Sequence, residues 1–146
     1  IMGCEALQKG ASKVLAVERD KGNYKICKDN LYTIANTVSQ KKYISVIQKD
    51  VIKFLKKGTS EINLEGFNKN MIFDIIYLDP PYKDENIYCD VLSSLIKGNW
   101  ISRDSIVICE YYSGFTLKTK PPWVELDRRI YGNSSLLLLG LTPPSQ

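Results

Sequence analysis

Residues 79–82 have the clearest chemical potential, because one aspartate stands directly before two prolines and a tyrosine. Each proline fixes its own φ and holds the residue before it extended. The Asp79 carboxylate and the Pro80 carbonyl can therefore face the same way, and neither Pro80 nor Pro81 has an N–H donor. Two neighbouring acceptors match the two hydrogens of an exocyclic amine on a nucleobase.

Tyr82 adds a flat ring on which such a base can stack, a contact worth roughly 1–3 kcal/mol. The alternative is a proline-rich turn with a buried tyrosine and no ligand. The apolar run IIYL directly before Asp79 favours a site. Open parallel sheets bind their ligands beyond the carboxyl ends of their strands, which is where this acid would lie.

Two further acids, Glu18 and Asp50, follow apolar runs in the same manner. An acid at a strand end can accept hydrogen bonds from ribose hydroxyls. The next acid can accept from an adenine amino group while Val51 covers the ring. The alternatives are a solvated strand end for Glu18 and a simple helix N-cap for Asp50. Three acids at equivalent positions favour one nucleoside-binding edge.

Strands and helices alternate along the chain. Short apolar strands separated by helices imply a mostly parallel sheet with helices on both faces. The last two strands form an antiparallel hairpin at one side of the sheet. We therefore expect an α/β fold in one domain over residues 1–146. The expected strands are 13–18, 43–48, 72–78, 105–112 and two within 123–141, and the helices are 2–10, 20–38, 51–57 and 85–99.

Composition excludes several kinds of site. The chain has no histidine, and its four cysteines show no CxxC spacing, so we expect no metal site. The apolar runs are too short to span a membrane. Residues 1–70 hold 13 Lys/Arg against 7 Asp/Glu. That excess suits a polyanionic partner, although a solvated lysine-rich surface explains it equally well.

The chain resembles the bacterial RsmD family of S-adenosylmethionine-dependent methyltransferases along almost its whole length. D-P-P-Y after a strand is the motif of amino-methyltransferases. The order of several further segments narrows the resemblance to RsmD. These segments are GCEALQKGASKVLAVERDKGNYKICKDNL, IQKDVIKFL, FDIIYLDPPY, GNWIS, IVICE and RRIYGNSSLLLL.

The resemblance implies a Rossmann-like class I methyltransferase that methylates the exocyclic N2 amine of a guanine in small-subunit ribosomal RNA. It implies that Asp79, Pro80, Pro81 and Tyr82 form the catalytic turn. It also implies an N-terminally incomplete domain, without the family's first strand and glycine-rich loop. The implied residues for S-adenosylmethionine are Glu18 and Arg19 near the ribose, Asp50 and Val51 at the adenine, and Asp79.

The implied partner is ribosomal RNA in the small ribosomal subunit. A monomer in the cytoplasm is expected, or in an organelle stroma if a transit peptide precedes Ile1. One alternative is an adenine-N6 methyltransferase of DNA or RNA, which the same motif permits. Another is a non-catalytic nucleic-acid-binding remnant of the fold. A nicotinamide oxidoreductase has little support, because its glycine fingerprint is not visible.

Overall fold

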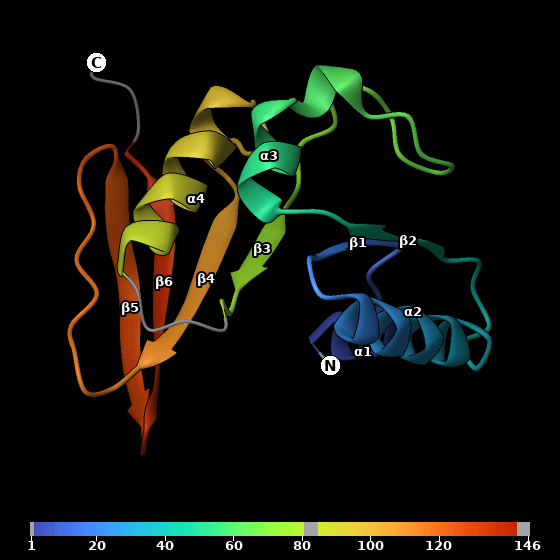
Figure 1. The fold of residues 1–146 in the computed structure, drawn as a ribbon, viewed down its shortest axis with the longest axis horizontal. Helices are drawn as coiled ribbons and strands as arrows, with labels where there is room; N and C mark the ends of the chain where they lie inside the picture. Colours follow the sequence, from blue (N-terminus) through green and yellow to red (C-terminus); the bar gives the residue numbers. More distant parts are fainter. Residues whose placement is uncertain (1, 81–84, 143–146) are drawn as a thin grey trace. The chain divides into compact units, whose positions relative to one another are not determined.

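The computed structural model describes residues 2–80 and 85–142. The chain divides into two compact units, Ile1–Met71 and Ile72–Gln146 (Figure 1). None of the helices in the described ranges combines the length and the apolar character needed to cross a membrane.

The first unit is a two-stranded parallel sheet packed against helices. β1 and β2 pair in register from Lys13 opposite Tyr43 to Glu18 opposite Gln48. Leu7 and Leu31, on α1 and α2, are almost completely buried. The elements are α1 Met2–Gln8, β1 Lys13–Glu18, α2 Lys21–Ala35, β2 Tyr43–Gln48, α3 Val51–Lys56 and the 3-10 helix η1 Thr59–Glu61.

Short-range signals set the ends of these helices. Asp20 caps α2 by accepting from the N–H of Asn23 at 2.8 Å. α1 ends two residues before Gly10, whose φ of +112° favours glycine. Gly3 matters for packing instead, since a Cβ there would lie 2.9 Å from Leu31. A side chain at this position would force Leu31 to shift, so glycine favours the close approach of α1 to α2.

The second unit holds a four-stranded sheet in the order β3-β4-β6-β5. β3 and β4 are parallel, whereas β6 runs antiparallel to both β4 and β5. The β5–β6 hairpin turns at Gly132, whose φ is +60°. The elements are β3 Ile75–Leu78, α4 Glu85–Lys97, β4 Ile106–Tyr112, β5 Trp123–Tyr131 and β6 Ser134–Leu141.

One face of this sheet forms the core of the second unit. Cys109 and Leu137, which are cross-strand partners, are fully buried, as are Val107 and Leu139. Helix α4 lies against the sheet (Figure 1) and buries Val91, Leu92 and Leu95. Complete burial of such side chains is worth about 1.5–3 kcal/mol each, so the core holds the carboxyl ends of β3 and β4 in place.

The fold class predicted from sequence is confirmed as α/β with a parallel part and an antiparallel hairpin. Two details differ. The third strand begins at Ile75 rather than Ile72, because the Phe73 N–H bonds Trp100 O instead of a neighbouring strand. The strands also form two sheets within the described residues, so helices on both faces of one common sheet remain a prediction.

Candidate active site

The predicted catalytic turn begins at the carboxyl end of β3. The strand ends at Leu78, and Asp79 follows as an exposed residue. Pro80 is partly buried. Pro81 and Tyr82 lie outside the described residues, so their expected roles stay predictions. The acid is therefore found at the edge of the sheet where the apolar strand was expected to place it.

A second carboxylate, Glu110, stands next to Asp79 at this edge. Leu78 pairs with Cys109 in the last row of the β3–β4 ladder, so Asp79 and Glu110 each follow that row on their own side. The Tyr77 hydroxyl donates to Oε1 of Glu110 at 2.6 Å. The edge of the second unit therefore carries two acids, one of which is oriented by a tyrosine.

Tyr88, on α4, donates its hydroxyl to the backbone carbonyl of Glu110. Burial raises the pKa of Tyr88 to about 12, and the nearby Cys109, Asp79 and Glu110 add to the increase. Burial also raises the pKa of Tyr77, together with its hydrogen bond to Glu110 and the Asp79 charge. Both hydroxyls therefore remain protonated donors at neutral pH.

Sequence reasoning missed Glu110, Tyr77 and Tyr88. Glu110 lies inside β4 rather than after it, so it was interpreted as part of a strand. The signal that could have found it is register. A parallel partner that starts level with β3 places its fifth residue beside the residue after a four-residue strand.

The first unit presents its own acids at a carboxyl edge. Glu18 ends β1 opposite Gln48, and the Lys49 N–H donates to the Glu18 carbonyl at 3.0 Å. Asp50 follows at once and precedes α3. The structure thus brings Glu18 and Asp50 to one edge of the β1–β2 sheet.

Asp50 caps α3, as one interpretation of the sequence proposed. Its Oδ1 accepts from the Lys53 N–H at 3.1 Å, and its Oδ2 lies 4.0 Å from Arg19 Nη1. The Arg19 side chain is 82% exposed, so this ion pair contributes little. Val51, the first residue of α3, is partly buried. Capping occupies one carboxylate oxygen and does not prevent Asp50 from also binding a ligand.

The hydrogen-bond acceptors at this edge suit an adenosine group. Glu18 and Asp50 are partly buried carboxylates, which accept hydrogen bonds from hydroxyl and amino groups. Glu18 also lies close to Cys27, since burial and then the Glu18 charge raise the pKa of that thiol. Whether Glu18, Asp50 and Asp79 line one common edge remains a prediction, because they belong to different units.

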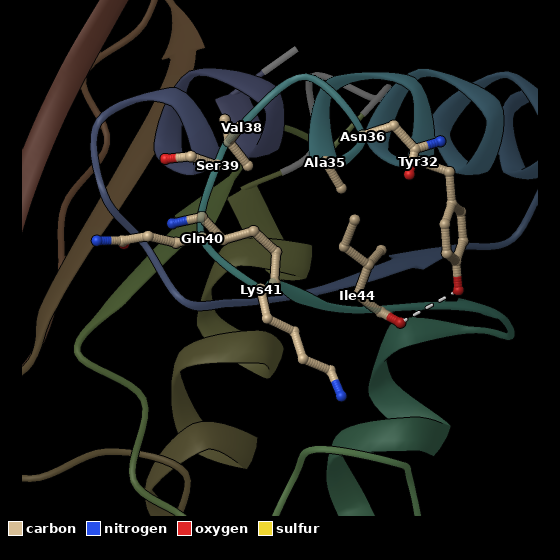
Figure 2. A pocket seen from close by; sticks show the side chains of 9 residues that line it. Tyr32, Ala35, Asn36, Val38, Ser39, Gln40, Lys41 and Ile44 are labelled. Carbon is tan, nitrogen blue, oxygen red and sulfur yellow. Dashed lines mark hydrogen bonds between the residues drawn. The ribbon is translucent and has the colours of Figure 1, made fainter.

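A cavity of about 470 Å³ opens elsewhere in the first unit, between the end of α2 and the start of β2 (Figure 2). The Tyr32 hydroxyl bonds the Ile44 carbonyl at 3.4 Å on one side. The cavity contains none of the predicted site residues, and it adjoins the amino end of β2 rather than its carboxyl end. Its lining residues are Tyr32, Ala35, Asn36, Val38, Ser39, Gln40, Lys41, Lys42 and Ile44.

Comparisons with known proteins identify relatives of the chain. Ribosomal RNA small subunit methyltransferase D of Haemophilus influenzae is 28% identical over 131 residues, which cover 90% of this chain. The chain spans 61% of the length of that relative. A solved structure of a protein from the same organism, named as a methylase, has 27% identity and a TM-score of 0.73, covering 97% of this chain and 80% of its own.

A methyltransferase structure from Escherichia coli has 20% identity and a TM-score of 0.75, with 97% of this chain and 70% of its own covered, which supports the Rossmann-like fold. The family model described as Conserved hypothetical protein 95 matches residues 1–140. The family predicted from the sequence motifs is thereby confirmed: the chain belongs to this RsmD family.

Proposed function

We propose that the protein transfers a methyl group from S-adenosylmethionine to the exocyclic N2 amine of a guanine in small-subunit ribosomal RNA. The observation that carries this proposal is Asp79, an acid followed by Pro80 at the carboxyl end of β3, in a chain of this family. The curated relative from Haemophilus influenzae is named for methylation of small-subunit ribosomal RNA. The proposed substrate is therefore the small ribosomal subunit. We propose that the enzyme acts on it as a monomer in the cytoplasm.

The amine of a base is a poor nucleophile because its lone pair is delocalised into the ring. Acceptance of its two hydrogens by the Asp79 carboxylate and the Pro80 carbonyl favours a pyramidal nitrogen with a localised lone pair. The same acceptors stabilise the positive charge that develops on nitrogen. As the bond from the nitrogen to the methyl carbon forms, the bond from that carbon to sulfur breaks and its electron pair stays on the sulfur. The surplus proton leaves the nitrogen for Asp79 and then water. Tyr82 holds the base, which must leave its stack to enter the site.

S-adenosylmethionine, when bound, supplies an electrophilic methyl group. We assign its ribose hydroxyls to Glu18 and its adenine amino group to Asp50, with Val51 against the ring and Arg19 nearby. Alignment of the amine with this group supplies much of the remaining rate increase. The proposed chemistry needs no metal and no histidine base.

The test compares Asp79→Ala with Glu18→Ala in the full-length protein. Asp79→Ala should lower methyl transfer to unmethylated small subunits by about a thousandfold, because both charge stabilisation and amine orientation are lost. Glu18→Ala should instead weaken S-adenosylmethionine binding by about tenfold or more, measured by calorimetry. The control is an unchanged circular dichroism spectrum for both variants.

Three outcomes would contradict the proposal. Undiminished transfer by Asp79→Ala would remove the catalytic role of the turn. Incorporation of labelled methyl groups into adenine would mean the alternative amino-methyltransferase. The absence of any heat of S-adenosylmethionine binding to the unaltered protein would mean a non-catalytic member of the fold.

A further inference from the structure

Guanine carries one donor that the proposed turn leaves unmatched. Asp79 and Pro80 account for the two hydrogens of N2, but guanine also presents an N1–H beside that amine. Adenine presents an acceptor, N1, beside its own exocyclic amine. A carboxylate only accepts hydrogen bonds. A second carboxylate placed next to Asp79 can therefore distinguish the two bases.

Glu110 has that position. Tyr77 pairs with Ile108, and side chains two residues apart on a strand share a face, so Tyr77 and Glu110 stand on the same side of the sheet. Their 2.6 Å hydrogen bond agrees with this geometry. Adjacent strands lie about 4.8 Å apart, a separation that the side chain of a glutamate can span.

Hydrogen bonds fix both the carboxylate and the backbone of Glu110. The Tyr77 hydroxyl binds Oε1, and the Tyr88 hydroxyl binds the backbone carbonyl of the same residue. No hydrogen bond reaches Oε2 within residues 2–80 and 85–142, and the residue is partly exposed. One oriented oxygen is thus left to receive a donor from outside the chain. Such support is what an accurate binding group requires.

We infer that Glu110 selects guanine as the target base by accepting its N1–H, while Asp79 and Pro80 accept the hydrogens of N2. This inference rests on the proposed function and names the specificity residue of its site. It makes Tyr77 a positioning residue, which orients Glu110 without touching the base. A purely structural Glu110 would stabilise β4 and would not change which purine is methylated.

The first test needs no variant. The methylated nucleotide of the small ribosomal subunit is mapped, and subunits are reconstituted with guanine or 2-aminopurine at that position. 2-Aminopurine keeps the N2 amine but has a lone pair at N1 in place of N1–H. The unaltered full-length enzyme should prefer guanine in kcat/KM by roughly 10- to 100-fold, because the carboxylate would face a second acceptor in the analogue.

The second test exchanges the acceptor for a donor. In Glu110→Gln the side-chain oxygen can keep the bond from Tyr77, while the amide N–H₂ faces the base. This variant should lose about tenfold or more on guanine and should prefer 2-aminopurine. Tyr77→Phe should prefer guanine over 2-aminopurine by a smaller factor than the unaltered enzyme does, but it should not prefer 2-aminopurine. Glu125→Gln, on β5 of the same sheet, is the matched control and should change neither rate.

Binding supplies a readout that is independent of methyl transfer. The fluorescence of 2-aminopurine depends on stacking, so its change on enzyme addition reports transfer of the base from the RNA stack into the site. The half-saturating enzyme concentration should be lower for Glu110→Gln than for the unaltered enzyme, and unchanged for Glu125→Gln.

The outcomes separate this inference from the proposed function. Methylation of guanine and 2-aminopurine at equal rates by the unaltered enzyme overturns the role of Glu110 and leaves the proposed function standing. If Glu110→Gln retains the full preference for guanine, the role of Glu110 is likewise overturned and the proposed function still stands. The absence of methylated guanine with the unaltered enzyme defeats the proposed function itself. Reversal of the preference in Glu110→Gln alone supports the inference.

Discussion

The two sheet edges of this protein carry acids in different surroundings. At the edge of the first unit, Asp50 is bound by a backbone N–H and Arg19 lies 4.0 Å away at the surface. At the edge of the second unit, Glu110 is held by two tyrosine hydroxyls. One of these, Tyr88, is only 3% exposed. The cap of Asp50 is local in sequence, whereas both hydrogen bonds to Glu110 join residues more than 20 positions apart.

The difference suits the two tasks that we propose. Ribose and adenine offer several donors and acceptors, so an exposed edge with two acids can hold them. Selection of one base requires an acceptor fixed against a specific atom, because a site built for one hydrogen bond rejects an analogue that lacks it. The second edge supplies that fixation through Tyr77 and Tyr88.

The largest expected effect tests whether the two units behave as one domain, as we propose. Leu31→Ala in the first unit and Leu137→Ala in the second each remove a buried side chain and should lower the free energy of unfolding by about 2–5 kcal/mol. Unfolding in urea is followed by far-UV circular dichroism and by the fluorescence of Trp100 and Trp123, which both lie in the second unit. Any tryptophan outside this sequence is replaced by phenylalanine.

Leu31→Ala should then shift the fluorescence transition as far as the circular dichroism transition. A fluorescence transition that stays in place while the dichroism splits into two steps would mean that the units unfold separately. The comparison of the two edges would then be one between two independent folding units.

A smaller effect separates capping from ligand binding at the first edge. Asp50 and Asp20 both cap a helix, through Lys53 N–H and Asn23 N–H. Alanine at either position should cost about 1 kcal/mol of stability, because a terminal N–H loses its acceptor. Only Asp50→Ala should also weaken S-adenosylmethionine binding, by about tenfold in calorimetry. An equal loss of affinity in Asp20→Ala would reduce Asp50 to its role as a cap.

The smallest effect concerns pH at the second edge. The pKa of Tyr88 is raised to about 12 from a usual value of 10.0, so the folded state favours the protonated phenol. Its contribution to stability is complete below pH 10 and is lost as the pH rises towards 12, by at most about 3 kcal/mol. Tyr88→Phe removes this dependence and also the bond to the Glu110 carbonyl.

Tyr88→Phe should therefore be less stable than the unaltered protein by about 1 kcal/mol at pH 8, and the difference should narrow above pH 10 and change sign before pH 11.5. Unfolding in urea at each pH measures it. Tyr32→Phe is the control, since that ring is 45% exposed. A constant difference across this range would show that the hydroxyl of Tyr88 is not protected from ionisation.

Much of the fold could be predicted from local patterns. Strands Lys13–Glu18 and Tyr43–Gln48 are found with the predicted bounds, because short apolar runs between turn residues have few alternatives. The capping role of Asp50 was also among the interpretations. The start of the third strand was wrong, since Phe73 is apolar like a strand residue but bonds the loop at Trp100.

The sequence by itself determined the family, the order of strands and helices, and the position of Asp79 at the end of a strand. Each of these depends on residue types and spacing within a short segment. The tertiary structure alone decided that Glu110 stands beside Asp79 and that Tyr77 and Tyr88 hold it. Glu110 lies 33 positions from Tyr77 and 22 positions from Tyr88. Only the pairing of β3 with β4 and the packing of α4 bring these residues together. Register and helix packing depend on which residues meet across the core, so they could not be predicted from any one of these segments.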